Sequence, residues 1–268
     1  MKKHKYKIIC SLIVVIVVIA LATLRFCYSE KPVHLSFDDV SICMSDLTKD
    51  SLKYNSIFEQ PFLADLKQLH ESTGAKFTLY VYEMDKDYDI AQFPDKFASE
   101  FDANHDWLCI GYHAKRPEYT PDSIAQNDAF CKSFTRVDSI LAHKFKRAKS
   151  NTLRLHYFYA TPEKIKLVIS RGITKLLAAD DDRISYSLPE NDNAQLQSQE
   201  LLQKDGMTYV STDLRIERDN TLWGLIKNAN DDEFVIFTHE WAYNGLNRGA
   251  YKVIIHFLNM CNCKYENK

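Results

Sequence analysis

From Pro32 onward, short apolar runs alternate with longer stretches of helical spacing. The short runs are rich in β-branched and aromatic residues and predict strands over 33–37, 77–82, 107–112, 153–157, 173–178, 207–211 and 234–237. The longer stretches predict helices over 52–69, 93–101, 121–145, 162–170 and 248–259. Residues 180–205 are polar, and we expect them to be irregular. This β-α alternation predicts an α/β fold with a parallel sheet and helices outside, closed into a barrel or left open.

The first thirty residues differ from the rest of the chain. Four lysines precede an uncharged run over 8–24, which would measure roughly 25 Å as a helix, at the lower limit for crossing a bilayer. Ala20-Leu21-Ala22 also suits a cleavage site. We therefore expect residues 1–30 to be a signal peptide or a signal anchor, with a transmembrane helix at about 8–25 and a single domain over 31–268. The lysines should stay cytoplasmic, so this domain should be exported and either anchored, facing the periplasm or cell exterior, or secreted.

Composition excludes several classes of protein. With 46 % apolar residues the chain can bury a core, which a disordered protein cannot. The 34 basic and 36 acidic residues give a net charge of −2, and no basic bias points to nucleic acid as a partner. Five of the basic residues and no acidic ones lie within 1–25, so the exported part is acidic. The seven cysteines fit neither a disulfide scaffold nor a zinc knuckle, and we expect most to be thiols.

Polar residues gather where four predicted strands end, which is where α/β folds place their functional residues. Asp38 and Asp39 follow the first strand, and two adjacent carboxylates there usually have a cation beside them. His113 follows the strand over 107–112, while Arg154 and His156 are expected on one face of their strand. The strand over 234–237 runs into Thr238-His239-Glu240-Trp241. Each group alone could be a capped strand end or a solvated turn, but together they indicate one site.

In the order of these motifs, residues 33–240 resemble the polysaccharide deacetylases, the NodB-homology carbohydrate esterases. The run Leu35-Ser36-Phe37-Asp38-Asp39-Val40 is similar to their T-F-D-D-G motif, Gly111-Tyr112-His113 to the start of H-x-x-x-H, and Leu153–Tyr157 to R-x-P-Y/F. Asp180-Asp181-Asp182 falls where the family has an acidic motif, and Phe237-Thr238-His239 is similar to the closing motif. The resemblance implies a distorted (β/α) barrel of about seven strands.

The resemblance also implies the roles of individual residues. Asp38 would be the catalytic base, Arg154 would orient it with the acidic motif as partner, and His239 would be the general acid. Asp39 and His113 would bind a divalent metal, with zinc the expected ion. The second metal histidine of the family should stand at position 117, which is Pro117 here. A third ligand could come from His156, Glu118 or His239, and we choose His156 because imidazole suits zinc.

These roles imply a metal-dependent hydrolase that removes N- or O-linked acetyl groups from an envelope or extracellular glycan. Tyr112, Tyr157 and Trp241 are the expected substrate-binding residues, and an acetylated glycan and the membrane are the expected partners. One alternative is a glycan-binding protein that has lost its metal, which Pro117 would support. Another is a glycoside hydrolase that pairs Asp38 or Asp39 with Glu240 and needs no metal.

Overall fold

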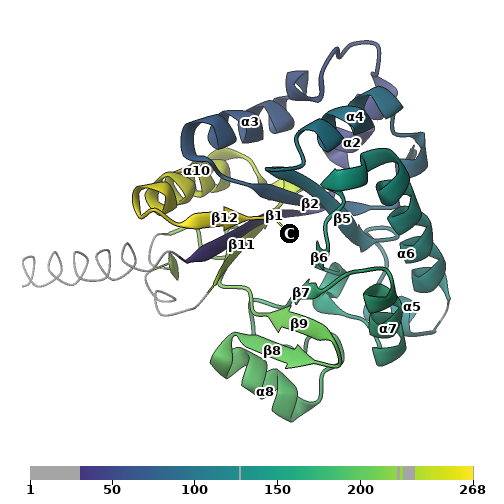
Figure 1. The fold of residues 1–268 in the computed structure, drawn as a ribbon, viewed down its shortest axis with the longest axis vertical. Helices are drawn as coiled ribbons and strands as arrows, with labels where there is room; N and C mark the ends of the chain where they lie inside the picture. The colour runs from purple at the N-terminus through teal and green to yellow at the C-terminus, as the bar shows by residue number, and fades with distance from the viewer. Residues whose placement is uncertain (1–30, 127, 222–223, 226–232, 268) are drawn as a thin grey trace, which may run out of the picture.

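The computed structural model describes residues 31–126, 128–221, 224–225 and 233–267. Its larger sheet is parallel and contains the first strand of the domain at its centre (Figure 1). The strands lie in the order β10 (Leu214–Arg215), β11 (Phe234–His239), β1 (Pro32–Val40), β2 (Phe77–Tyr82) and β5 (Leu108–Ala114), and β12 (Lys264–Glu266) pairs with the first residues of β1. Because every pair is parallel, the carboxyl ends of the strands meet at one edge.

A second sheet continues this architecture. It contains β6 (Thr152–Leu153), β7 (Lys175–Leu177), β9 (Met207–Val210) and β8 (Leu201–Lys204), parallel apart from the β8–β9 pair. A parallel bridge pairs Ile110 of β5 with Lys149, in the segment that leads into β6. A small hairpin of β3 (Met84–Asp85) and β4 (Tyr88–Asp89) follows β2. The expected α/β fold with a parallel sheet is thus confirmed, and the described strands form two larger sheets and a small hairpin rather than one continuous barrel.

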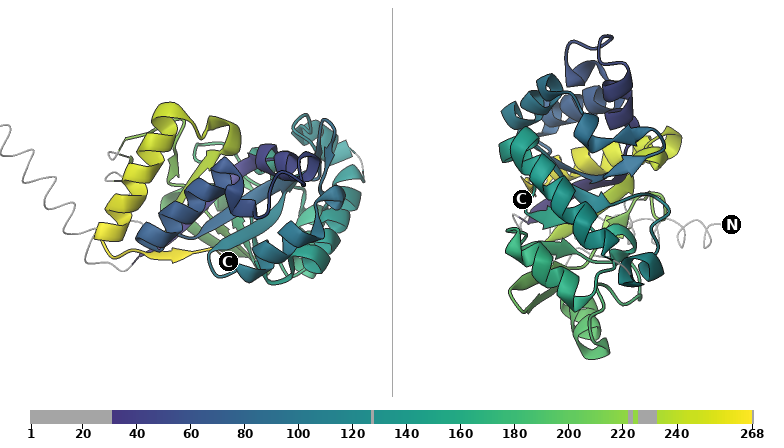
Figure 2. Two further views of the ribbon diagram at one scale, coloured as in Figure 1. Left: turned by 90° about the horizontal axis from the view of Figure 1, so that it is seen from above. Right: turned by 90° about the vertical axis from the view of Figure 1, so that its right-hand side faces the viewer.

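Helices surround the sheets, as Figures 1 and 2 show. They are α2 (Ile42–Lys49), α3 (Pro61–Thr73), α4 (Asp95–Ala103), α5 (Pro121–Gln126), α6 (Ala129–Ile140), α7 (Pro162–Ser170), α8 (Glu190–Gln199) and α10 (Gly245–Met260). The core between α3, α10 and the larger sheet centres on Phe37, whose ring packs edge-on against Phe62, Tyr243 and Tyr251. Such aromatic pairs hold β1, and with it the strand end that carries Asp38 and Asp39, in a fixed position.

The helix expected over 52–69 begins later than predicted. Leu52 is 99 % exposed, and α3 starts at Pro61, where Gln60 accepts hydrogen bonds from the N–H groups of Phe62 and Leu63. The cap and the proline at the first helical position set this start. The sequence pattern also missed α2, which directly follows β1.

Three other predicted elements differ from the structure. The helix expected over 121–145 is divided into α5, α6 and a π-helical turn over Leu141–Phe145. The strand expected over 153–157 ends at Leu153, and His156–Phe158 forms a 3-10 turn in which Tyr157 has a φ of 56°. The region 180–205, expected to be irregular, contains α8 and β8.

The expected leader, residues 1–30 with its apolar run, lies outside the described residues. Within the described part, every helix is too short or too polar to cross a bilayer.

Candidate metal centre and catalytic site

The site lies at the edge where the parallel strands of the larger sheet end. Asp38 and His239 are direct register partners on the adjacent strands β1 and β11. Tyr82 is the last residue of β2, and His113 is the last residue but one of β5. The topology therefore brings together residues from four strands that are far apart in the sequence, as expected for the carboxyl edge of a parallel sheet.

Asp39 reaches the site through an irregularity in β1. The register between β1 and β2 shifts between Phe37 and Val40, and Asp39 has a φ of 57°. Aspartate is among the few residues that tolerate this left-handed conformation, and bulges commonly re-aim a side chain at functional sites. The shift separates the two carboxylates: that of Asp38 is buried next to Arg154, while that of Asp39 points toward two histidines.

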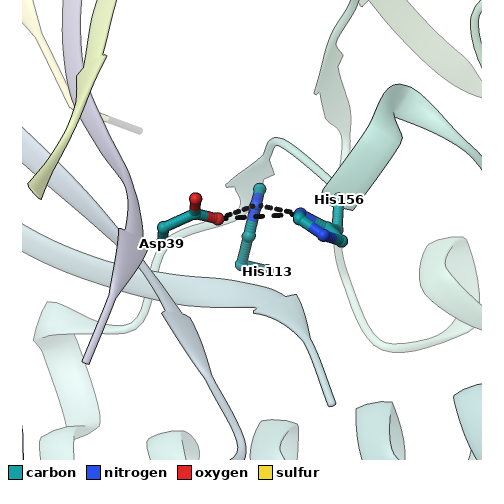
Figure 3. Close-up of side chains that lie close together, drawn as sticks. All are labelled: Asp39, His113 and His156. Carbon is teal, nitrogen blue, oxygen red and sulfur yellow. Dashed lines mark hydrogen bonds and ion pairs between the residues drawn. The ribbon is translucent and has the colours of Figure 1, made fainter. Parts of the chain in front are cut away.

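Asp39, His113 and His156 bring three donor atoms together (Figure 3). Their ligand atoms all lie within 4.8 Å of one another. Asp39 Oδ1 is 3.2 Å from His113 Nε2 and 3.6 Å from His156 Nδ1. Two imidazole nitrogens and a carboxylate oxygen form a set that suits zinc and related divalent ions, with positions left open for water and substrate.

The tautomers of the two histidines support a cation at this point. His113 Nδ1 is 2.6 Å from the carbonyl oxygen of Arg154, and His156 Nε2 is 3.2 Å from that of Pro117. A carbonyl can only accept, so each ring places an N–H there, and a neutral ring then turns the lone pair of its other nitrogen inward. The two inward nitrogens are 3.0 Å apart. Two lone pairs at this distance repel each other unless a proton or a metal ion lies between them, so these residues fit a metal ion.

Pro117 thus contributes its backbone carbonyl to the site. The family pattern places a metal-binding histidine at this position, and the structure instead uses its backbone carbonyl to orient His156. Such outer hydrogen bonds fix the ring that binds the metal. Burial lowers the pKa of His156 to about 4, which keeps the ring neutral and able to bind a metal at pH 7.

Two aromatic side chains hold the Asp39 carboxylate. The Tyr82 hydroxyl donates to Oδ1, and Trp241 Nε1 donates to Oδ2 over 3.0 Å. Burial alone would raise the pKa of Asp39, but with a proton on His113 Nε2 in place of a metal ion, the hydrogen bond and charge of His113 outweigh burial and hold this pKa well below its usual range. Burial would in turn lower the pKa of His113, and the contact with Asp39 raises it. Tyr82 was not among the expected site residues, because its strand reads as a uniformly buried aromatic run.

Arg154 is fully buried and holds Asp38. Its guanidinium donates to Ser36 Oγ at 2.7 Å, to Asp38 Oδ1 at 3.2 Å and to Thr212 Oγ1 at 3.2 Å. A buried guanidinium needs such partners. The expected acidic partner of Arg154 is wrong, because Asp180 and Asp181 pair with Arg218 instead. The expected single strand face is also wrong, since β6 ends before Arg154 and His156 lies in the following turn.

Glu217 is a member of the site that the sequence analysis missed. Its Oε1 accepts a hydrogen bond from His239 Nδ1, and Thr238 Oγ1 and Arg215 Nε fix the same carboxylate at 2.9 and 2.7 Å. Burial would raise the pKa of Glu217, but the His239 hydrogen bond lowers it to about 2. The pairing leaves His239 Nε2 directed toward Asp39 Oδ2, 3.7 Å away. Glu217 follows β10, a two-residue strand with no clear sequence signal.

The expected substrate-binding residues separate into two groups. Trp241 is 55 % exposed and stacks on His239, and Tyr157 is 44 % exposed and contacts the ring of His156. Both therefore border the site and can meet a ligand. Tyr112 does not: it is buried between Phe130 and Phe134, and its hydroxyl donates to Ser133 Oγ. The expected role of Tyr112 is wrong because its side chain points under α6.

Glu240 is a structural residue. Its buried carboxylate accepts the backbone N–H groups of Ser41, Ile42 and Cys43 at 2.7–2.9 Å and thereby caps the start of α2. Acceptors at a helix N-terminus also benefit from the helix dipole. Glu240 therefore faces away from the reaction site, and the expected carboxylate pair of a glycoside hydrolase is not formed.

Comparison with known proteins gives information on the fold. Neither a family model nor a curated protein matches the sequence. A protein described as a polysaccharide deacetylase from Mycobacterium smegmatis is similar in structure, with a TM-score of 0.53 and 14 % identity over 90 % of this chain and 88 % of that one. A 4-alpha-glucanotransferase from Thermococcus litoralis has a TM-score of 0.52 and 9 % identity over 89 % of this chain. The chain spans 39 % of that glucanotransferase.

A CE4 esterase from Streptococcus mutans is matched with a TM-score of 0.46 and 12 % identity, over 91 % of this chain and 89 % of that one. The structural neighbours with a TM-score above 0.5 thus include a protein described as a polysaccharide deacetylase, at low sequence identity. Because a glucanotransferase shares the fold about equally well, the fold alone does not decide the chemistry.

Proposed function

We propose that the protein is a metal-dependent hydrolase that removes acetyl groups, N- or O-linked, from an envelope or extracellular glycan. The observation that carries the proposal is the donor set of Asp39, His113 and His156, in which the other nitrogen of each histidine ring meets a backbone carbonyl. When bound there, a divalent ion, with zinc the expected one, would supply Lewis-acid polarisation of an acyl carbonyl and activation of water.

The chain's own residues supply the proton transfers. Asp38 lies beside this donor set and would accept a proton from the attacking water. Arg154 holds the Asp38 carboxylate in place through its hydrogen bond to Oδ1. His239, oriented by Glu217, would donate a proton to the leaving nitrogen or oxygen. The products would be acetate and a free amine or hydroxyl, and Trp241 and Tyr157 would contact the sugar rings.

The structure favours this proposal over both alternatives. Pro117 suggested a glycan-binding protein that has lost its metal. The Pro117 carbonyl, however, orients His156 as a replacement ligand, so the donor set still has three members. Binding alone would also not require the Asp38–Arg154 and His239–Glu217 pairs. The glycoside hydrolase lacks its second carboxylate, because Glu240 caps α2.

The proposal includes a location. We infer that residues 31–268 act outside the cytoplasm, attached to the membrane if the leader stays on the chain. This follows from the lysines and the apolar run of residues 1–30.

Acetate release from acetylated chito-oligosaccharides and peptidoglycan fragments tests the activity. The zinc-loaded wild type should release acetate, and Asp38→Asn should lower the rate by roughly 10²–10⁴-fold, the usual contribution of a general base. Asp180→Asn is the matched control, since Asp180 pairs with Arg218 away from the site. If the metal-loaded wild type releases no acetate from either substrate class, the proposal is wrong.

A further inference from the structure

Helix α10 carries an apolar stripe on its outer side. Leu246 is 85 % exposed, Val253 56 % and Met260 71 %. They are seven residues apart, two helical turns, so they lie in one line that runs roughly 21 Å along the helix. The opposite face of α10 buries Tyr251 and three aliphatic side chains in the core. Figure 2 shows α10 at one end of the molecule, with its outer side facing away from the sheet.

The charge around the stripe is also unusual for this chain. Residues 241–265 contain no aspartate or glutamate, although acidic residues outnumber basic ones beyond the leader. Arg248 and Lys252, on another side of α10, both bond to Asp65 of α3. An exposed apolar line on a helix without acidic residues is typical of a surface that contacts another apolar phase.

The start of the described chain lies next to one end of this stripe. Shortly after Met260, β12 pairs with the beginning of β1, and the Lys264 N–H donates to the Lys31 carbonyl at 3.0 Å. The apolar run of the leader ends at Leu24, seven residues before Lys31, and so many residues span at most roughly 25 Å. A leader held in a bilayer would therefore keep α10 within reach of the same bilayer.

We propose that the outer stripe of α10, formed by Leu246, Val253 and Met260, lies on the lipid surface of the membrane that holds the leader. This inference rests on the expected anchor and is independent of the hydrolase activity. The pairing of β12 with β1 places this end of α10 beside the end of the leader, which favours the membrane as the occupant, and a second copy of the chain is an outcome of the test below.

This contact would also set the position of the site. α10 begins shortly after Trp241, at the strand edge that carries the site, and returns to the edge where β1 begins. If it lies along the bilayer, the Leu246 end brings the mouth of the site to the lipid surface. The enzyme would then act on glycan close to the membrane.

Photolabelling by lipids tests the contact. The full chain is reconstituted in phosphatidylcholine–phosphatidylglycerol vesicles that contain a diazirine lipid, and labelled tryptic peptides are mapped by mass spectrometry. We expect label in the leader and in the peptide over 253–264. The same peptide of the L246S/V253S/M260S variant should carry several-fold less label. Leu52→Ser is the matched control, because Leu52 is exposed on a different element.

Label in the leader without label in α10 would overturn the proposal, as would cross-links from α10 to a second copy in place of lipid. An intact chain whose leader takes up no label would also overturn it, since the leader would not be in the bilayer. Acetate release from soluble substrate is measured on the same samples, so failure of the membrane contact is distinguished from failure of the hydrolase proposal.

Discussion

His113 Nε2 and His156 Nδ1 face each other across 3.0 Å, while the other nitrogen of each ring donates to a backbone carbonyl. When both rings are neutral, this arrangement brings two lone pairs together beside the Asp39 carboxylate. It is the reason to expect a metal ion at this edge of the sheet, and each prediction below follows from how the neighbouring residues hold this site or the fold around it.

Replacing Tyr82 by phenylalanine should weaken metal binding without unfolding the protein. The hydroxyl fixes Asp39 Oδ1, and loss of such an outer hydrogen bond typically lowers metal affinity roughly 10–100-fold. Competition with a chromophoric chelator measures the zinc affinity of the metal-stripped full chain. Tyr88→Phe is the matched control, because its buried hydroxyl has no hydrogen-bond partner in the described part of the chain. Equal affinities for the two variants would contradict the assigned role of Tyr82.

Replacing Glu217 by glutamine should lower kcat for acetate release by about 10²-fold with little change in KM. The carboxylate orients His239, and a misplaced general acid acts in the transition state rather than in substrate binding. Steady-state kinetics on an acetylated chito-oligosaccharide measures both constants. Asp180→Asn should leave both within about twofold of the wild type. A raised KM with unchanged kcat would instead place Glu217 in substrate binding.

Replacing Glu240 by glutamine should reduce stability, because one carboxylate serves three N–H groups of α2. Hydrogen bonds to charged groups contribute about 1.5–3 kcal/mol each at most, and the neutral amide retains part of this, so we expect a loss of about 1–3 kcal/mol. Urea unfolding gives the value, with the exposed Glu266→Gln as control. Unchanged stability together with lost catalysis would instead assign Glu240 a catalytic role.

Asp65 should make stability depend on acid pH. Burial would raise its pKa, but hydrogen bonds from Arg248, Lys252 and Tyr243 lower it from 3.8 to about 2. A depressed carboxyl pKa stabilises the fold above the unfolded value, and this contribution is lost as the pH falls from about 4 through 2. We expect Asp65→Asn to lower the free energy of unfolding by about 2 kcal/mol at pH 7. The variant should also lose less stability than the wild type as the pH falls. Urea unfolding across pH 2–7 measures this pH dependence, with Asp182→Asn as the control. A pH dependence of stability in Asp65→Asn equal to that of the wild type would contradict the prediction.

The sequence predicted the strand ends well and the connections less well. Continuous apolar runs identified β1, β2, β5 and β11, so Asp38, Asp39, His113 and His239 could be placed at one edge before the structure. β10, the edge strand of the larger sheet, has only two residues, and its periodicity is too short to recognise. That is why Glu217, after β10, was not found.

Orientation was harder to predict than position. Tyr82 and Tyr112 both lie on buried aromatic strands, yet the Tyr82 hydroxyl meets Asp39 and the Tyr112 hydroxyl meets Ser133. The register of the β2–β5 pair shifts just before Tyr82, and no sequence pattern records this shift. Similarly, Glu240 has the residue type of a catalytic carboxylate, and only its three backbone contacts show that it is a cap.

Metal binding tests the central claim most directly. Metal-stripped full chain is titrated with zinc, and bound metal is measured by calorimetry and elemental analysis. We predict one ion per wild-type chain, and for His113→Ala and His156→Ala a loss of affinity beyond the roughly 100-fold expected for an outer hydrogen bond. His143→Ala, on an exposed histidine, should bind like the wild type. A wild type that stays metal-free in excess zinc, or a His156→Ala variant with unchanged affinity, would contradict the account.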